Sequence, residues 1–225
     1  MSETRAADGV RFWPKELLKG WRIKRFTSAL VGGRSHASYL IELGFCGPIA
    51  RGYDAIDNEL FRTESNKWRT IDLCAGNQIR PYLLASSRFV ERKNLIRLVQ
   101  AFAEVAGPCQ SRPDVTLDLC LVGDGPERPA LQSICNSLDL TMVELAPWEL
   151  ACSPDSTMLK SRVFLPGFRQ IAELPRFYAH ACCFVHPAIS EPWGLVMNEA
   201  MACGLPVLAS RNCGAAEELV FHGVN

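Results

Sequence analysis

Two glutamates eight positions apart, Glu191 and Glu199, are the residues of this sequence whose types and spacing most suggest chemistry. Between residues 194 and 203 the chain is almost wholly apolar, which predicts a buried helix with Glu199 as its single carboxylate. Because an unpaired buried charge costs several kcal/mol, Glu199 should have a committed partner. That partner is either a backbone amide or an arginine of the protein, or a hydroxyl of a ligand.

The start of the same helix is suited to an anion. Glu191 lies in the loop just before it, and the first N–H groups of a helix have no partner within the helix, which favours phosphate. From Gly194 to Glu199 a helix rises about 7 to 8 Å, roughly the span from a diphosphate to its ribose. The segment therefore suits a nucleotide diphosphate, although two glutamates at this spacing also have purely structural roles in proteins.

The loop expected at residues 87–94 carries two cations that could reach such a diphosphate. Arg88 offers a planar fork of donors and Lys93 a compact point charge. Taken as isolated charges, both could instead belong to a solvated surface.

Two further positions lie near the expected site. In the turn at residues 123–126, Gly123 lets the backbone approach a ligand closely, whereas the plainer interpretation is a tight connection with Asp124 capping the next helix. His186 ends a predicted strand, and we interpret it as a packing or hydrogen-bonded residue.

The elements that must position these residues alternate regularly from about residue 82 onward. Short apolar runs are followed by loops and then by stretches with apolar residues at helical spacing, which predicts βαβ units and a parallel sheet covered by helices on both faces. The ligand site of such a sheet lies beyond the carboxyl ends of its strands. The expected strands are 81–86, 116–122, 162–167, 182–186 and 205–210, and the expected helices are 94–106, 127–138, 171–180 and 194–203.

Two regions depart from this alternation. The polar stretch 141–161 is interpreted as a surface insertion. Residues 1–81 have fewer strand signals, with a strand expected at 26–31 and a helix at 36–43, and are interpreted as the remnant of another domain plus a linker. The expected division is therefore 1–81 and 82–225, with both ends of the chain truncated.

Composition narrows the class of protein. A formal net charge of zero over 225 residues argues against a nucleic-acid binder. The first thirty residues contain no signal peptide, and no segment is apolar enough to span a bilayer. The ten cysteines lie in apolar contexts without the spacing of metal ligands, so we expect buried thiols, a cytoplasmic location and no metal site.

Set in order, these segments resemble the retaining glycosyltransferases of family four, which have the GT-B fold of two facing Rossmann-like domains. The resemblance is strong over residues 83–225 and looser over 26–62, and the match in order and spacing is more specific than any single motif. It rests on Ser87-Arg88-Phe-Val-Glu-Arg-Lys93-Asn94, Leu121-Val-Gly-Asp-Gly-Pro-Glu127, Val163-Phe-Leu-Pro-Gly167, Glu191 to Glu199, and Gly204-Leu-Pro-Val-Leu-Ala-Ser210.

The resemblance implies roles for the candidate residues. Glu191 would lie beside the donor sugar, and Glu199 would bind the ribose of the nucleotide. Arg88 and Lys93 would neutralise the departing diphosphate without a metal or other cofactor. The donor would also contact the chain at four positions where the backbone is expected to approach it: Gly194, Leu195, Val196 and Gly123.

The activity implied is transfer of a hexose from a nucleotide diphosphate sugar to an acceptor hydroxyl, with retention at the anomeric carbon. The acceptor would be a glycan, a lipid or a small molecule, and peripheral membrane contact through the missing part of the acceptor domain is also expected. Two alternatives stay open at this point. The chain could be a catalytically inactive fragment that binds nucleotide sugar, or a nucleotide-sugar epimerase with the same fold.

Overall fold

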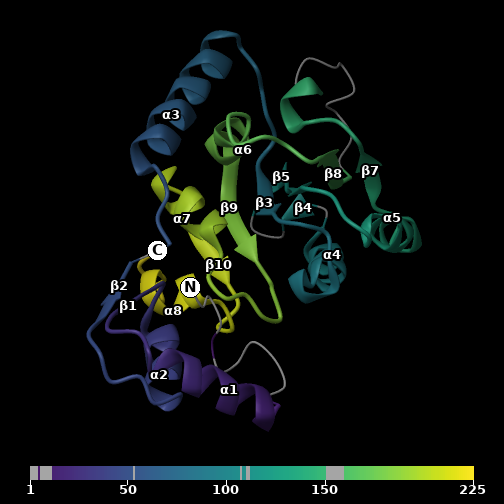
Figure 1. Cartoon of the computed structure of the whole chain (residues 1–225). Helices are drawn as coiled ribbons and strands as arrows, with labels where there is room; N and C mark the ends of the chain where they lie inside the picture. Colours follow the sequence, from purple (N-terminus) through teal and green to yellow (C-terminus); the bar gives the residue numbers. More distant parts are fainter. Residues whose placement is uncertain (1–4, 6–11, 53, 107, 110–111, 151–159) are drawn as a thin grey trace.

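The computed structural model describes Arg5 and residues 12–52, 54–106, 108–109, 112–150 and 160–225. Its main feature is a six-stranded sheet in the order β10-β9-β3-β6-β8-β7, in which every neighbouring pair is parallel (Figure 1). The predicted parallel sheet is therefore confirmed. The strands are β3 (Tyr82–Ser86), β6 (Asp118–Val122), β7 (Thr141–Val143), β8 (Arg162–Gly167), β9 (Ala181–His186) and β10 (Val207–Ala209).

Helices cover both faces of this sheet, because successive side chains of a strand point to opposite sides. Leu84 and Phe184 enter one buried cluster, whereas Ala85 and Val185 enter the other. Helices α6 (Leu174–His180), α7 (Leu195–Ala202) and α8 (Gly214–Leu219) contribute to the first cluster, and α4 (Leu95–Val105) and α5 (Arg128–Ser137) to the second. The predicted α/β architecture is confirmed on both faces.

The interpretation of residues 141–161 as an insertion is wrong at its beginning. Thr141–Val143 forms β7, which pairs with β8 at the edge of the main sheet, and a 3-10 turn, η2, follows at Pro147–Glu149. A three-residue edge strand that is only half-buried has too short an apolar pattern to be recognised from sequence. Residues 151–159 lie outside the described residues.

A small antiparallel pair, β4 (Pro108–Cys109) and β5 (Arg112–Thr116), precedes β6.

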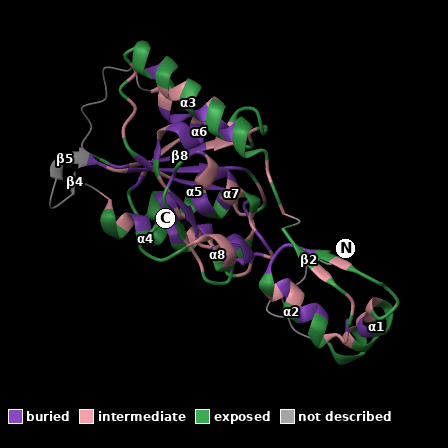
Figure 2. Cartoon of the chain, turned by 90° about the vertical axis from the view of Figure 1, so that its left-hand side faces the viewer, coloured by how far each residue is buried: buried purple, intermediate pink, exposed green. Residues whose placement is uncertain are grey.

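The N-terminal part forms a smaller unit. It contains α1 (Trp13–Ile23), β1 (Ala29–Val31), α2 (Arg34–Glu42) and β2 (Ile49–Arg51), and its two strands are parallel. The expected strand at 26–31 and helix at 36–43 are thus present with shifted boundaries. Figure 2 shows this unit projecting to one side of the main sheet.

Helix α3 (Asn58–Cys74) lies against α6 and α7 rather than against the smaller unit (Figure 1). Arg69 of α3 donates to the carbonyl oxygens of Ala179 and Cys203, each at 2.8 Å, which satisfies carbonyl groups at the ends of α6 and α7. Asp72 binds Arg176 through both carboxylate oxygens. The helix is therefore anchored to the larger unit, although the division of the chain at residue 81 stays a prediction. No helix among the described residues is long and apolar enough to cross a membrane.

Candidate functional site

The loops that follow β3 and β9 meet at the carboxyl ends of these two neighbouring strands. There the Nζ atom of Lys93 donates to Oε2 of Glu191, and each side chain is only 11% exposed. Lys93 belongs to a 3-10 turn, η1 (Glu91–Lys93). The sequence predicts three catalytic side chains, Glu191, Arg88 and Lys93, and the structure pairs the first with the last.

Two hydrogen bonds to backbone carbonyl groups fix the relative position of these loops. The amide of Ile189 donates to the carbonyl oxygen of Arg92 at 2.8 Å, and Asn94 Nδ2 donates to the carbonyl oxygen of Pro187 at 3.2 Å. Asn94 adopts a left-handed conformation with φ 59°, which asparagine tolerates better than most residues. The ion pair is thus held between two connected segments.

Glu191 is strongly biased toward its charged form. Burial alone would raise its pKa, but His186 and Lys93 together outweigh burial and lower the pKa from the ordinary 4.5 to about 2. His186 Nε2 lies 3.6 Å from Glu191 Oε2, the side chain is 2% exposed, and this nitrogen has no hydrogen-bond partner among the described residues. The candidate site therefore includes His186, which sequence reasoning had interpreted only as a packing or hydrogen-bonded residue.

The start of α7 lies directly beyond Glu191. Gly194 is its N-cap with φ 97°, and a Cβ atom there would lie 3.2 Å from Cγ of Glu191. The amides of Gly194, Leu195 and Val196 are at the end of the helix where no preceding turn supplies carbonyl acceptors. The predicted arrangement of Glu191 beside a helix N-terminus is present.

Glu199 has a partner that the sequence did not predict. Its Oε2 atom accepts a hydrogen bond of 2.7 Å from the hydroxyl of Tyr178, which is fully buried. Burial raises the pKa of Glu199 more than this hydrogen bond lowers it. Oε1 makes no hydrogen bond with the described residues, and the predicted contact of Glu199 with a ribose hydroxyl stays a prediction. The protein partner of Glu199 is therefore a tyrosine hydroxyl, and not the backbone amide or arginine that the sequence predicts.

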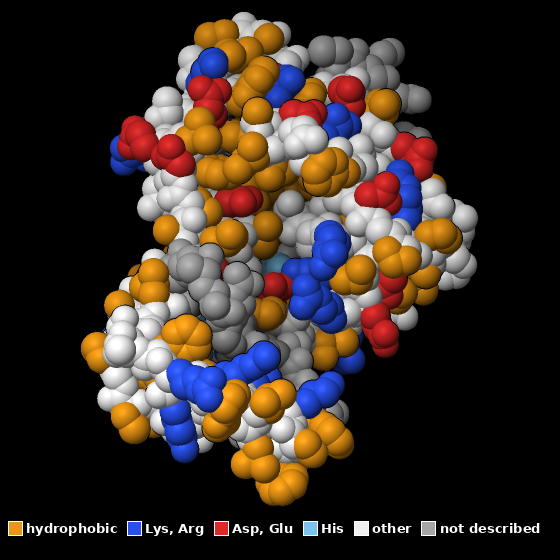
Figure 3. Space-filling model, in the orientation of Figure 1, with side chains coloured by type: hydrophobic (Ala, Val, Ile, Leu, Met, Phe, Trp, Pro, Cys, Tyr) orange, Lys and Arg blue, Asp and Glu red, His pale blue; other side chains and the backbone are white. Residues whose placement is uncertain are grey.

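Arg88 is exposed in the loop after β3, whereas Lys93 from the same loop is buried. Figure 3 shows a hollow midway along the molecule, where acidic and histidine side chains lie beside a group of basic side chains. The structure thus brings Lys93, Glu191 and His186 together and leaves Arg88 at the surface.

Gly123 acts through close packing in this structure. A Cβ atom would lie 1.8 Å from the carbonyl oxygen of Ser87, and the Gly123 amide already donates to the carbonyl oxygen of Gly167 at 3.0 Å. Asp124 does not cap α5, whose N-cap is Glu127; its Oδ1 accepts from the amide of Gly125 instead. The turn supports the loop that carries Arg88, and a direct donor contact from Gly123 stays a prediction.

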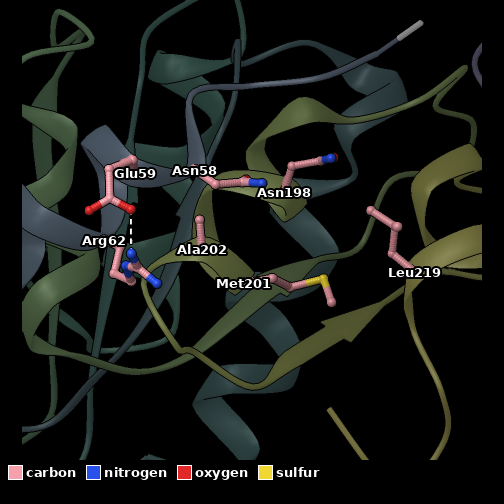
Figure 4. Close-up of a pocket in the computed structure, with 7 residues that line it drawn as sticks. All are labelled: Asn58, Glu59, Arg62, Asn198, Met201, Ala202 and Leu219. Carbon is pink, nitrogen blue, oxygen red and sulfur yellow. Dashed lines mark hydrogen bonds and ion pairs between the residues drawn. The ribbon is translucent and has the colours of Figure 1, made fainter. Parts of the chain in front are cut away.

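A separate cavity of about 400 Å³ lies between α3, α7 and α8 (Figure 4). Asn58 of α3 and Asn198 of α7 both line it, and the Asn58 side chain extends toward α7. Its lining contains none of the candidate residues: it consists of Asn58, Glu59, Arg62, Asn198, Met201, Ala202 and Leu219. Among the described residues, no three histidine, cysteine or carboxylate side chains are grouped as metal ligands would be.

Comparison with known proteins identifies the family. The model of the family described as glycosyl transferases group 1 matches residues 80–225. A probable sucrose-phosphate synthase 2 of Arabidopsis thaliana is 31% identical over 154 residues, which are 67% of this chain and 14% of that protein. The sucrose-phosphate synthase of Spinacia oleracea is 29% identical over 154 residues, 67% of this chain and 13% of that protein.

Solved structures agree in fold. The Anabaena protein HepE in complex with UDP superimposes with a TM-score of 0.69 at 24% identity, covering 94% of this chain and 52% of HepE. The pneumococcal O-GlcNAc transferase GtfA, in complex with UDP and GlcNAc, gives a TM-score of 0.63 at 19% identity, covering 92% of this chain and 34% of GtfA. The parallel sheet with helices on both faces matches GT-B glycosyltransferases, and this chain belongs to the glycosyl transferases group 1 family.

Proposed function

We propose that this chain binds a nucleotide diphosphate sugar and supplies the donor side of a retaining hexosyltransferase. Family membership supports sugar transfer, and HepE has been solved with UDP and with UDP-glucose. The observation that carries the proposal is the buried Lys93–Glu191 pair beside the open N-terminus of α7, with Glu199 on the same helix. Such a site has positive groups for a diphosphate and an acid for the ribose.

The proposed chemistry depends on charge that develops on the leaving group. The bond from the anomeric carbon to the diphosphate oxygen breaks, and the acceptor hydroxyl oxygen bonds to that carbon on the face just vacated. The hydroxyl proton passes to the departing phosphate. Lys93, Arg88 and the amides at the start of α7 stabilise the growing negative charge, so the proposal requires no metal or other cofactor. Glu191 positions the sugar, and Oε1 of Glu199 accepts from a ribose hydroxyl.

Binding is tested by thermal denaturation with UDP-glucose, GDP-glucose and ADP-glucose in parallel. A ligand that binds only the folded protein raises the melting temperature. We expect one of the three to do so with wild-type protein and to have a smaller effect on Glu199→Ala. If none raises the melting temperature at millimolar concentration, the proposed donor binding is wrong.

Two other activities use the same fold and are separated by the products. An inactive binding fragment would bind the nucleotide sugar and leave it intact with every acceptor class offered. An epimerase would convert the nucleotide sugar with no acceptor present, which NMR of the sugar protons detects. The basic loop favours transfer because its cations would stabilise a departing diphosphate, and the spacing of Glu191 and Glu199 favours transfer because it matches the donor-site motif that the chain resembles.

We also propose that the protein is cytoplasmic and makes peripheral contact with anionic membranes through α1. The eight cysteines whose side chains the structure describes are free thiols, which agrees with a reducing compartment. Cys46, Cys74 and Cys182 are exposed, so the expectation that all the thiols are buried is wrong for these three. Helix α1 turns polar groups toward the protein, since Lys19 Nζ donates to the hydroxyl of Tyr39, which in turn donates to Glu16. Its outer side is apolar and more than half exposed at Trp13, Leu17, Leu18 and Trp21.

Charge around α1 complements an anionic surface. Residues 12–26 contain five basic residues and one acidic residue, whereas the whole chain is neutral. Figure 3 shows apolar side chains flanked by basic ones at the end of the molecule where α1 lies. Exposed apolar and basic side chains on one helix are typical of attachment to the membrane interface. Leu17→Glu should reduce co-sedimentation with phosphatidylserine vesicles, and Leu73→Glu, at an 80% exposed position of α3, should not. Equal loss by both variants contradicts this assignment.

A further inference from the structure

His186 is placed to act on the donor site without being part of the predicted diphosphate contacts. Its Nε2 atom faces the same oxygen, Oε2 of Glu191, that Lys93 binds. Its ring stacks on Phe184 two positions earlier in β9, with an angle of 15° between the planes, and its carbonyl oxygen accepts from the amide of Ser210. The ring is therefore held beside Glu191 by its own strand and by the neighbouring strand β10.

The groups around this histidine come from several elements. Lys93 approaches from η1, and Arg5 lies at the carbonyl oxygen of Asn212, next to Cys213. Burial and the nearby Glu191 raise the pKa of Cys213 to about 12, so it stays a neutral thiol near neutral pH. Phe184, which stacks on the ring, carries no charge. Arginine and lysine side chains remain protonated near neutral pH, and imidazole is the side chain whose ordinary pKa lies near that range.

Binding of a diphosphate changes the charge balance of this cluster. In the unliganded structure Lys93 and Glu191 neutralise each other. A diphosphate brings two negative charges to the same place and competes for Lys93. If Lys93 turns to the phosphates, Glu191 is left buried, negative and close to another anion, which is unfavourable unless a new cation appears. His186 is the basic side chain already placed beside that carboxylate.

We propose that donor binding moves Lys93 from Glu191 to the diphosphate, and that His186 takes up a proton from solvent and replaces Lys93 as the partner of Glu191. The only bond formed in this step is an N–H bond at Nε2 of His186, and its proton comes from solvent. The inference rests on the proposed donor binding. His186 is on this account a positioning residue, because it holds Glu191 ionised and oriented beside the sugar while Lys93 is engaged elsewhere.

The proton uptake has a measurable consequence. Because one proton is bound with the ligand, affinity falls as pH rises, by up to about tenfold per pH unit where histidine is mostly neutral. Titration calorimetry at pH 7.5 in buffers of different ionisation enthalpy reports the number of protons directly. The probe is UDP-glucose, with GDP-glucose and ADP-glucose in parallel. Both phosphates of these compounds are esterified, so the ligand itself takes up no proton near neutral pH.

We expect wild-type protein to take up close to one proton per donor bound. His186→Gln should still bind the donor, more weakly, with proton uptake near zero. Its affinity should no longer depend on pH over about two units above the ordinary histidine pKa, from about 6.5 to about 8.5. His222→Gln alters an exposed histidine near the chain end and should behave as wild type. If His186→Gln does not fold, the imidazole carbon shifts of His186 in wild-type NMR spectra report its protonation when donor is added.

The failures are distinguishable. Donor binding with no proton uptake by the wild type, or with no change in the imidazole shifts, overturns this inference and leaves the proposed function standing. Uptake that persists in His186→Gln also overturns it, because Glu191 itself would then be taking the proton. Absence of binding by all three nucleotide sugars overturns the proposed function, and the inference with it.

Discussion

The coupling between Lys93 and Glu191 can be measured by a double-mutant cycle of Lys93→Met and Glu191→Gln. The pKa of Glu191 lies at about 2 instead of 4.5, because Lys93 and His186 outweigh the effect of burial. At about 1.4 kcal/mol per pH unit this corresponds to roughly 3 kcal/mol of favourable interaction. Solvent screening at the rim of the site reduces our expectation to about 2 kcal/mol of coupling between the two side chains.

The sign of the pH dependence follows from the direction of the shift. Because the folded-state pKa is depressed, the stabilisation by ionised Glu191 is fully present above pH 4.5 and is lost as pH falls toward 2. In Lys93→Met the carboxylate loses its main cation and accepts a proton more easily. The cost of that variant should therefore be smaller at pH 4.5 than at pH 7.

The assay is urea unfolding of the wild type, both single variants and the double variant at these two pH values. The matched control is the exposed pair Lys67–Glu64 on α3, with side chains 57% and 32% exposed, whose coupling should stay below about 1 kcal/mol. A Lys93–Glu191 coupling energy no larger than that of the control would refute the reasoning, because the buried ion pair would then stabilise the fold no more than an exposed one.

Three further predictions address the packing around the site and its ligand contact. Gly123→Ala should lower the free energy of unfolding in urea by at least about 3 kcal/mol, because its Cβ would lie 1.8 Å from the Ser87 carbonyl oxygen. The control is Gly76→Ala, which has no atom within 4 Å of the added Cβ and should cost about 1 kcal/mol. Asp72→Ala should cost about 3 kcal/mol at pH 7, because the buried Asp72 carboxylate is the shared partner of two half-buried side chains, Arg176 and His180. Burial raises the pKa of Asp72, but its partners lower it further, so the wild type should lose this stabilisation as pH falls below about 4, and thermal denaturation between pH 3 and 7 checks the sign. Glu199→Ala should weaken nucleotide-sugar binding by about tenfold in calorimetry, the equivalent of one hydrogen bond to a charged group; unchanged affinity contradicts the ribose contact.

The sequence was sufficient for the βα alternation and for the loops that carry the site. Strands of the main sheet are short runs buried on both faces, and the helices between them have apolar residues at helical spacing, so each element is encoded by its own local pattern. The exceptions have local causes too. Thr141–Val143 is a three-residue edge strand, and the tie of α3 to the larger unit depends on Arg69 and Asp72, which a local pattern cannot assign to distant partners.

For the site, the sequence by itself determined which residue types stand at the carboxyl ends of the strands and at the start of α7. Only the tertiary structure decided how they pair. Lys93 and Glu191 are 98 positions apart, and they meet because β9 lies beside β3, an order that periodicity does not specify. The path of the loop after β9, where Glu191 pairs with Cys213, places His186 beside Glu191, and the packing of α6 on the sheet brings Tyr178 to Glu199. Ion pairs and hydrogen bonds depend on distances of a few ångströms, and those distances are set when the whole sheet assembles.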